Sequence, residues 1–519
     1  MDLSQWIAHH AGRQPACVAL RFEGADIRYD ALAAQIDAIA SAFAAQRVAR
    51  GDRIAWLGLN SPGMIAALFA CARIGAIFMP LNWRLAAPEH RAMLASCRPA
   101  LLFVEEPFVA DSARELIAPA KTRCIGVGAA ALPAGWSSWP SFLESGKGCA
   151  AAVLAGEDAA SADVLLCYTS GSTGRPKGAL LSQQALACNA LNSVDMHDIG
   201  ADDRVLTTLP LFHVGGLNIL TLPALRAGCR VTLHAKFDAD AAFDAIARER
   251  ITLTVLVPAQ LDAMLASPRW AQADLASLRM ITTGSTMVPP RIIRAVHARG
   301  VPLVQVWGAT ETSPIAACQH ADEAARTAGS TGRAARHCEL RITDVTGQDV
   351  PAGQAGEVLV RGANVMSGYW EDPEASARAL AGGWFHSGDL GHLDDQGYLT
   401  IDGRLKDMII SGGENVSPAE VETVLLECPD VAEAAVVGRP DARWGEVVVA
   451  VVVPASGATL QPAGVMALFD GRLARFKHPK DVVVVGALPR TALGKISKED
   501  VRQMVARLAG NAGLEGRAV

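Results

Sequence analysis

Hydrophobic residues in the first two thirds of the chain alternate between helical spacing and short continuous runs. Segment 32–43 carries an apolar residue at every third or fourth position, which is typical of one face of a helix. The runs 53–58 and 76–79 predict buried strands, and the apolar segment 64–74 between them predicts a helix. The alternation returns in strand-like runs at 230–233 and 252–257 and a helical segment at 241–250. This β-α order predicts an α/β fold with helices flanking largely parallel sheets.

The pattern changes near residue 400, where short strands and polar turns replace the long alternation. A strand predicted at 398–401 leads into a polar link at 403–407. We place the domain boundary within residues 402–407. The chain is then a large N-terminal domain with helix-flanked β-sheets (1–403) and a small mobile α+β C-terminal domain (404–519), and the C-terminal domain is of a size that can fold alone.

The C-terminal part opens with a helix-start signal. Ser417 can cap a helix, Pro418 suits its first turn, and Glu420 completes a capping box. Pro429 ends this helix. Beyond it we expect strands at 434–437 and 447–453 and helices at 465–475 and 498–508.

Composition narrows the class of protein. The chain has 519 residues, half of them hydrophobic, so a large core is possible, and its net charge of −6 argues against nucleic acid as a main partner. Its eleven cysteines are scattered, as expected of reduced thiols in a cytosol. The longest apolar stretch, 64–81, is interrupted by Arg73 and Gly75. We expect a cytoplasmic protein without a signal peptide or a transmembrane segment.

The most informative segment is Tyr168-Thr-Ser-Gly-Ser-Thr-Gly-Arg-Pro-Lys-Gly178, directly after the apolar run 164–167. Its glycines let backbone N–H groups approach a bulky anion, and Lys177 adds a cation, so a polyphosphate is the ligand that fits best. The spacing differs from the usual nucleotide loop, because Gly178 rather than a hydroxyl residue follows the lysine. A flexible surface turn is the alternative reading.

Further clusters carry chemistry in the same order along the chain. Trp307 in Gln305-Val-Trp-Gly-Ala-Thr-Glu311 offers a face for a base, and Glu311 offers a carboxylate for Mg²⁺ beside phosphates. Asp389 follows Gly388 in a loop and could accept from ribose hydroxyls. Lys495 follows a glycine near the C-terminus. Taken alone, each is more commonly a solvated surface residue or a turn.

Together, these clusters closely resemble the adenylate-forming superfamily of acyl-CoA synthetases, luciferases and peptide-synthetase adenylation domains. The phosphate loop, W-G-A-T-E, S-G-D-L, G-R-L-K-D, S-G-G-E-N and G-K all occur in the order of that family. The resemblance runs from about residue 10 to residue 508, and bacterial ligases for fatty or aromatic acids are most similar. It implies ATP, Mg²⁺ and coenzyme A as reactants or cofactors.

The resemblance also implies the roles of individual residues. Glu311 would bind Mg²⁺, and Lys495 would be the catalytic lysine that bridges the acid carboxylate and the α-phosphate. Lys406 would be the hinge about which the small domain rotates. The residues implied to bind ATP or coenzyme A are Thr169, Ser170, Gly171, Ser172, Thr173, Gly174, Lys177, Trp307 (usually Tyr in the family), Gly308, Thr310, Asp389, Arg404, Lys495 and, in the tunnel for pantetheine, Ser411, Gly412 and Gly413. Thr169 is also expected to take part in catalysis.

By the same resemblance, the acid pocket is walled by His213, Val214, Gly215, Gly216, Gly284, Ser285 and Ala309. These wall segments contain no lysine or arginine, which disfavours a substrate with a second carboxylate. No acid follows Phe212 to hold an α-amino group, which disfavours amino-acid adenylation. The glycines leave room for a chain or a ring, or else serve backbone packing alone.

The sequence therefore predicts an AMP-forming acid–CoA ligase for a monocarboxylic acid, with a medium- or long-chain fatty acid ranked first. An aromatic acid of the benzoate or hydroxycinnamate type is the alternative. A ligase that passes acyl-AMP to a carrier protein and a non-catalytic binding protein are the other readings. A homodimer is possible, although no sequence signal supports one.

Overall fold

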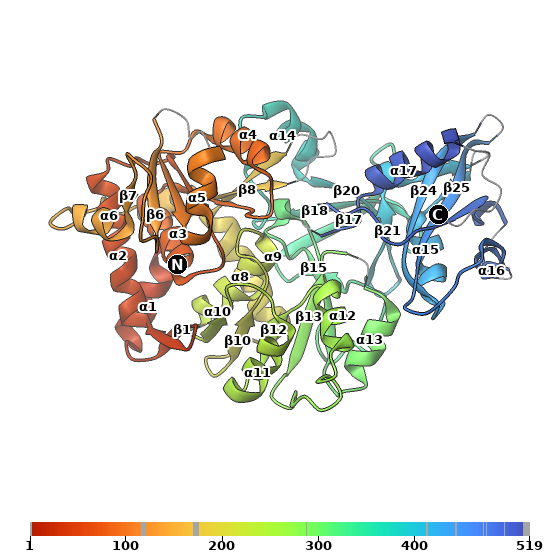
Figure 1. Cartoon of the computed structure of the whole chain (residues 1–519), viewed down its shortest axis with the longest axis horizontal. Coiled ribbons are helices and arrows are strands. Elements are labelled where there is room, and N and C mark those ends of the chain that lie inside the picture. The colour runs from red at the N-terminus through yellow and green to blue at the C-terminus, as the bar shows by residue number, and fades with distance from the viewer. Residues whose placement is uncertain are drawn as a thin grey trace.

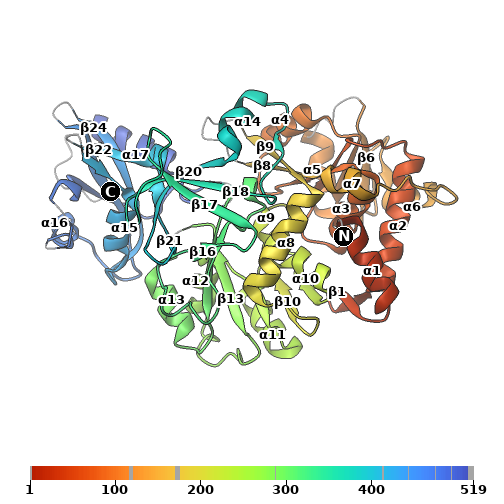
Figure 2. The same cartoon turned by 180° about the vertical axis from the view of Figure 1, so that it is seen from behind.

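The computed structural model describes residues 3–115, 121–169, 176–286, 288–411, 414–441, 444–470, 472–473, 475–491 and 494–511. Two large helix-flanked sheets and a four-stranded sheet form the bulk of the molecule, and a small unit with its own sheet lies at one end (Figure 1). The view from behind shows the same arrangement (Figure 2). The predicted fold class, α/β with a large N-terminal and a small C-terminal part, is confirmed.

The eight-stranded sheet has a parallel centre because its strands are joined through helices. Its order is β19 (Gly368–Tyr369), β9 (Lys177–Ser182), β8 (Asp163–Thr169), β4 (Ile77–Leu81), β3 (Arg53–Leu57), β5 (Leu101–Glu105), β6 (Arg123–Val127) and β7 (Ser137–Ser138). The helices of this part are α1 (Trp6–Arg13), α2 (Tyr29–Ala45), α3 (Pro62–Ile74), α4 (Ala87–Cys97), α5 (Glu106–Glu115), α6 (Trp139–Ser145) and α7 (Gly156–Ser161). The apolar face predicted for α2 is buried, and the predictions of α3 and β3 hold.

The nine-stranded sheet has the order β16 (Arg333–Ala334), β15 (Ala317–Cys318), β14 (Leu303–Trp307), β13 (Met280–Gly284), β12 (Leu253–Val255), β10 (Arg204–Thr207), β11 (Arg230–Leu233), β1 (Val18–Phe22) and β2 (Ala25–Arg28). Its helices are α8 (Gln183–His197), α9 (Val214–Gly216), the π-helical turn η2 (Leu217–Thr221), α10 (Leu222–Ala227), α11 (Ala239–Glu249), α12 (Pro258–Ala266) and α13 (Pro290–His297). Strands β10 to β14 run parallel, so their carboxyl ends meet at one edge, the usual place of a ligand in such sheets.

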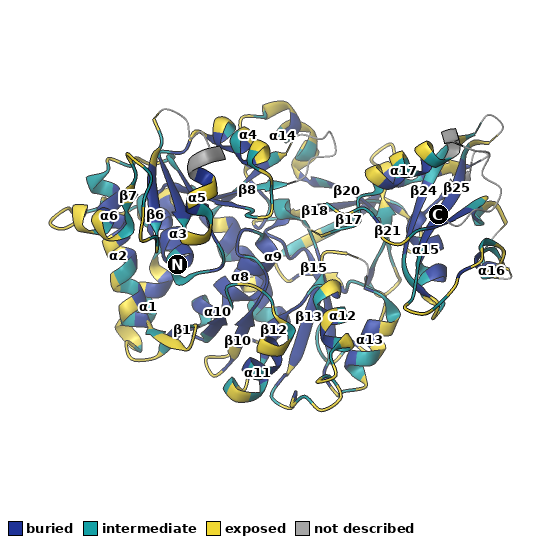
Figure 3. Cartoon of the chain, in the orientation of Figure 1, coloured by how far each residue is buried: buried dark blue, intermediate teal, exposed yellow. Residues whose placement is uncertain are grey.

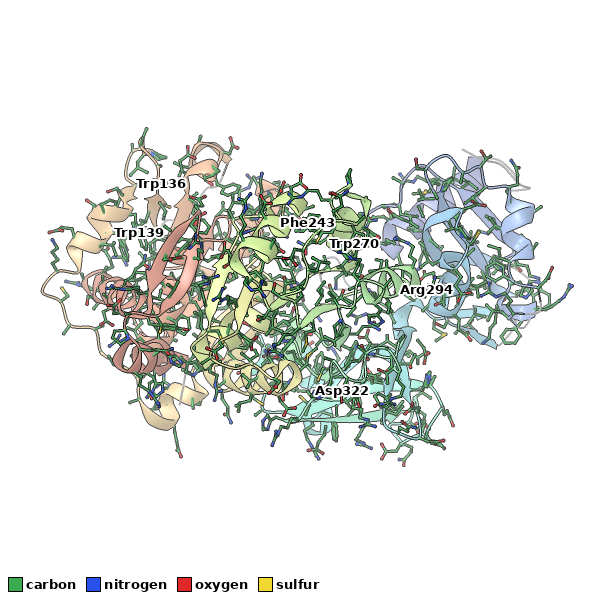
Figure 4. All side chains as sticks on the ribbon, turned by 90° about the horizontal axis from the view of Figure 1, so that it is seen from below. Trp136, Trp139, Phe243, Trp270, Arg294 and Asp322 are labelled. Carbon is green, nitrogen blue, oxygen red and sulfur yellow. The ribbon has the colours of Figure 1, made fainter. Side chains whose placement is uncertain are left out.

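Buried and exposed residues are separated according to the layers of sheets and helices. The central strands of both large sheets are buried, while the edge strands β2, β7 and β16 and the outer faces of the flanking helices are exposed or half-buried (Figure 3). Phe243 of α11 and Trp270 close the core on the outer side of the nine-stranded sheet, with ring centroids 6.4 Å apart (Figure 4). All eleven cysteines are free thiols, as expected. Within the described ranges, no helix is long and apolar enough to cross a bilayer.

The four-stranded antiparallel sheet consists of β17 (Cys338–Thr343), β18 (Gly356–Gly362), β20 (Phe385–Leu393) and β21 (Leu399–Arg404), with α14 (Pro373–Ala379) beside it. The register of β20 against β21 places Asp389 opposite Arg404. Because directly opposed residues of an antiparallel pair have neighbouring side chains, the sheet itself brings this acid and base together.

The C-terminal unit contains β22 (Ile409–Ser411), β23 (Glu414–Val416), β24 (Val431–Asp441), β25 (Gly445–Pro454), β26 (Asp481–Val484), α15 (Pro418–Leu426), α16 (Pro462–Ala467) and α17 (Lys498–Asn511). The helix predicted over 465–475 is wrong in its bounds. The helix begins at Pro462, which suits a first turn, and it ends at Ala467, shortly before Asp470 and Gly471, which disfavour helix. The domain boundary within 402–407 stays a prediction.

The capping box predicted for α15 is also wrong. Ser417 is the N-cap residue and Pro418 opens the helix, but Ser417 makes no capping hydrogen bond. Its hydroxyl donates instead to the carbonyl of Asp402, and Glu420 accepts from Lys477 Nζ at 2.7 and 2.8 Å. These long-range partners replace the local cap and join the start of α15 to β21 and to the 3₁₀ turn η6 (Arg475–Lys477).

Candidate active site

A buried carboxylate on β20 is the centre of the site. Asp389 is 8% exposed, with Oδ1 2.7 Å from Arg404 Nε, and its Oδ2 accepts from the indole Nε1 of Trp307 at 2.9 Å. Burial raises the pKa of Asp389, while the charge of Arg404, the indole N–H and Lys495 act to lower it. The carboxylate is thus held in one orientation by two donors from two different sheets.

Lys495, from the C-terminal unit, lies near enough to this carboxylate for the two charges to interact. It lies in a tight turn that includes Gly494, whose φ of +81° favours glycine, and its carbonyl accepts from Thr491 N at 2.7 Å. Burial and the charge of Arg404 lower the pKa of Lys495, whereas Asp389 and Glu311 raise it. The ammonium therefore interacts electrostatically with both acids of the predicted site, although it lies more than a hundred residues from Asp389 along the chain.

The flanks of the glycine-rich loop form the end of a hairpin. Thr169 and Lys177 are register partners of β8 and β9, and Thr169 Oγ1 donates to the carbonyl of Lys177 at 3.3 Å. Lys177 Nζ lies 5.0 Å from the ring centroid of Tyr369. Five of the predicted loop residues lie outside the described residues, namely Ser170, Gly171, Ser172, Thr173 and Gly174.

Tyr369 contacts both Lys177, which is predicted to bind phosphate, and Glu311, which is predicted to bind Mg²⁺. Its hydroxyl donates to Glu311 Oε1 at 2.9 Å, while its ring receives the Lys177 ammonium. The pairing of β19 with β9 places it there, because Tyr369 is opposite Ala179. Sequence reasoning missed this residue, since a lone tyrosine in a loop gives no signal of such a role.

Glu311 is the residue that could hold a metal. It lies in the short 3₁₀ turn η3 (Thr310–Thr312) and is partly exposed. Within the described ranges, no group of three or more His, Cys, Asp or Glu side chains gathers around a common point. Mg²⁺ is commonly held by one or two carboxylates together with substrate phosphates, so this donor set fits a magnesium ion that accompanies a nucleotide.

The wall predicted for the acid pocket is built around His213. Its Nδ1 accepts from Gly215 N at 3.0 Å and so caps the short helix α9, of which Val214 is a buried residue. Burial, and secondarily the charge of Lys495, lower the pKa of His213 to about 4. The imidazole is therefore neutral near pH 7. Ala309, just after β14, is partly buried.

The glycines of this wall, and Gly308 beside it, differ in what a side chain at their position would meet. A Cβ on Gly216 would lie 2.3 Å from the carbonyl of Pro210, and one on Gly284 would lie 2.4 Å from that of Val306, so both are required by backbone packing. A Cβ on Gly308 would lie 1.7 Å from the carbonyl of Pro314, which fixes the turn before Glu311. Gly215 differs, because its nearest neighbour would be His213 Nδ1 at 3.1 Å. Ser285 has a φ of +76°, in the left-handed region.

The remaining predicted residues lie on the C-terminal side of the site. Lys406 is exposed in the 3₁₀ turn η5 (Leu405–Asp407), and the adjacent Asp407 is buried and ion-paired with Arg502 of α17. Ser411 is buried at the end of β22, opposite Gly445. Gly412 and Gly413 lie outside the described residues.

This fold is that of an adenylate-forming enzyme. In it, a lysine of a small C-terminal unit interacts electrostatically with an Asp–Arg pair and with a glutamate. The chain belongs to the AMP-binding enzyme family, whose model matches residues 7–370, and the AMP-binding enzyme C-terminal domain matches residues 420–495.

Similar proteins narrow the class further. The chain is 60% identical over 98% of its length to an indoleacetate–CoA ligase of Aromatoleum aromaticum, covering 99% of that protein. It is 41% identical over 96% of its length to a feruloyl-CoA synthase of an Amycolatopsis species, covering 98% of it. The solved structure of ATP-bound MatB from Rhodopseudomonas palustris superimposes with a TM-score of 0.88 at 32% identity, over 98% of this chain and 100% of MatB. The protein is an ATP-dependent acid–CoA ligase, a class that uses ATP, Mg²⁺ and coenzyme A.

Proposed function

We propose that this ligase activates an aromatic monocarboxylic acid, with arylacetic acids as the preferred class. The observation that carries the proposal is the 60% identity, over nearly the whole chain, to an enzyme named for indoleacetate. The wall around the neutral His213 is consistent with it, because Val214, Gly215 and Gly216 bring no charge to the pocket. An apolar wall also suits the fatty acid that the sequence analysis ranks first, so the choice between them needs a direct assay.

In the first half-reaction, the acid carboxylate attacks the α-phosphorus of ATP, which gives an acyl-adenylate and pyrophosphate. We assign the ribose hydroxyls to Asp389 and Arg404, the adenine to the face of Trp307, and the outer phosphates to the hairpin that ends at Lys177. Lys495 faces the negative charge that develops between the carboxylate and the α-phosphate, and it stabilises the transition state more than the ground state. Mg²⁺ held at Glu311 would supply further charge neutralisation on the phosphates.

In the second half-reaction, the thiol of coenzyme A attacks the acyl carbonyl, the C–O bond to AMP breaks, and a thioester forms. AMP is a good leaving group, so this step does not need the charge of Lys495. We assign the hinge for the change between the two steps to Lys406, in the exposed turn beside the Asp407–Arg502 pair. The loop after Ser411 is then the proposed wall of the thiol tunnel.

A panel of acids tests the proposed substrate class. We expect CoA-dependent pyrophosphate release with indole-3-acetate, phenylacetate or a hydroxycinnamate, at a kcat/KM at least about tenfold above that for octanoate, palmitate, acetate and malonate, since a poorly matched pocket commonly costs 1–3 kcal/mol. A preference for octanoate or palmitate would overturn the aromatic proposal in favour of the fatty-acid alternative. Pyrophosphate exchange without any CoA-dependent turnover would support a carrier-protein ligase instead.

The lowered pKa of Lys495 makes the first step sensitive to alkali. The ammonium is required, and it is lost as the pH rises through a pKa that lies below the ordinary value of 10.5. We expect ATP–pyrophosphate exchange to fall on the alkaline side below pH 10.5. Thioester formation from supplied acyl-adenylate should lack this limb. An identical alkaline limb in both half-reactions, measured with enzyme that recovers full activity on return to neutral pH, would contradict the assignment.

The indole N–H of Trp307 gives a further prediction. In Trp307→Phe the aromatic face remains, but the 2.9 Å hydrogen bond to Asp389 is lost. We expect the KM for ATP to rise roughly tenfold, in line with one lost hydrogen bond to a charged group, and the preference for ATP over 2′-deoxyATP to shrink. The KM for the acid should change little. Trp307→Phe kinetics in which both nucleotides are affected equally would show that the indole does not position this carboxylate.

A further inference from the structure

We propose that Thr208 and a small cavity beside it form a polar subsite at the far end of the acid pocket, which binds a neutral N–H or O–H group on the substrate ring. This inference deepens the proposed function and rests on it. The subsite adds one directional contact to an otherwise apolar wall, and it would select among aromatic acids of similar shape.

The cavity lies where β10 ends and the π-helical turn η2 passes over it. Its volume open to the centre of a water molecule is about 10 Å³. It is lined by Leu206, Thr207, Thr208, Leu209, Gly215, Gly216, Leu220 and Val255. This is room for a single group of the size of a water molecule, a hydroxyl or the N–H edge of a ring. Four of these residues are Leu or Val and none is charged, so an ionised group is excluded.

Thr208 is a polar residue of this cavity, and its buried hydroxyl makes no hydrogen bond among the described atoms. The residue is 1% exposed. The neighbouring Thr207 is satisfied, because Thr221 donates to the carbonyl of Gly216 at 2.6 Å and can therefore only accept from Thr207, at 2.7 Å. Buried hydroxyls in native proteins are nearly always paired, so an unpaired one beside a cavity points to a group that enters it.

The cavity adjoins the reacting end of the acid through His213. Gly215 lines the cavity and donates its N–H to His213 Nδ1 at 3.0 Å, and His213 interacts with the charge of Lys495. Gly215 is also the wall glycine that backbone packing does not demand, in contrast to Gly216. A Cβ at this position would lie 3.1 Å from His213 Nδ1, so the imidazole packs directly against Gly215. We therefore place these groups, from the reacting end, in the order Lys495, His213, Gly215 and Thr208.

The chemistry of the subsite defines the substrate class. A threonine hydroxyl can both donate and accept one hydrogen bond, so it can pair with an indole N–H or with a phenol O–H. Both groups are neutral near pH 7 and project from the ring of an acid whose carboxylate lies at the other end. A plain fatty chain offers no such group, and it would leave the hydroxyl unpaired.

The test compares pairs of acids that differ only in the polar group. We propose measuring kcat/KM with indole-3-acetate against benzothiophene-3-acetate, and with 4-hydroxyphenylacetate against phenylacetate, for the wild type, Thr208→Val and Thr208→Ser. We expect the wild type to favour the polar member of one pair by about tenfold or more, since leaving one buried polar group unpaired carries a free-energy penalty of that size. In Thr208→Val the ratio should fall to about twofold, and Thr208→Ser should restore it. The pair that responds shows whether the group is N–H or O–H.

Three outcomes would overturn the subsite. They are an unchanged ratio in Thr208→Val, an equal loss for both members of a pair, and the absence of any preference in the wild type. The thermal unfolding midpoint of each variant separates misfolding from lost recognition, and Thr208→Ser keeps the proposal testable if Thr208→Val unfolds. If the wild type turns over fatty acids but no aromatic acid, the proposed function fails, and that result is distinct from failure of the subsite.

Discussion

Substitution of Lys495 by alanine is expected to lower the rate of acyl-adenylate formation by about a thousandfold or more, comparable to the removal of an electrostatic group from a buried active site. The physical reason is the position of the ammonium. It interacts with Asp389 and Glu311 in a partly buried site, where charge is weakly screened. The second half-reaction, started from supplied acyl-adenylate and coenzyme A, should keep a rate within about threefold of the wild type, because AMP is a good leaving group and its phosphate readily takes up the charge released when the C–O bond breaks.

The two half-reactions are each other's control. ATP–pyrophosphate exchange reports the first step and thioester absorbance reports the second, on the same preparation of Lys495→Ala. Lys495→Arg keeps the positive charge in a larger side chain and should recover part of the first step. An equal loss in both half-reactions would mean that Lys495 supports the structure of the site rather than the chemistry of adenylation.

The second large effect is expected for Asp389→Asn. An amide has one acceptor oxygen in place of two, so either Arg404 Nε or the indole N–H of Trp307 loses its partner. The ribose hydroxyls lose a charged acceptor at the same time. We expect the KM for ATP to rise roughly a hundredfold, since one or two hydrogen bonds to a charged group account for about 1.5–3 kcal/mol each.

The matched control for this change is Asp395→Asn, in an exposed turn before β21. It makes the same chemical change in the turn that joins β20 to β21 and should leave the KM for ATP unaltered. Isothermal titration with ATP measures the affinity directly, and a thermal unfolding curve reports any loss of stability. If Asp389→Asn binds ATP as tightly as the wild type, the assignment of the ribose site to this carboxylate is wrong.

Local patterns in the sequence are sufficient to predict much of the fold. Helix α2 and strand β3 follow directly from apolar spacing, and their burial is the one that the spacing predicts. The partners of Ser417 could not be predicted in the same way. Its local capping signal is strong, but the hydroxyl donates to Asp402, fifteen residues away, because the packing of α15 on β21 brings that carbonyl within reach.

In the candidate site, too, some residues are predictable from local sequence and others only from tertiary packing. Trp307, Asp389 and Lys495 are recognisable from their motifs, but the hydrogen bond between the first two depends on how two sheets meet. Tyr369 has no motif of its own, and it is placed between Lys177 and Glu311 by strand pairing alone. Thr208 is likewise invisible in sequence, because only a folded structure shows that its hydroxyl is buried without a partner. Contacts set by tertiary packing are therefore what the sequence leaves undetermined.

The most direct measurement is product analysis by mass spectrometry after incubation with indole-3-acetate, ATP, Mg²⁺ and coenzyme A. We expect indole-3-acetyl-CoA and AMP in equal amounts, with no ADP, and no thioester when ATP is omitted. A thioester formed only with octanoate or palmitate under the same conditions, or AMP released without any acyl-CoA, would contradict the claim that this protein is an aromatic acid–CoA ligase.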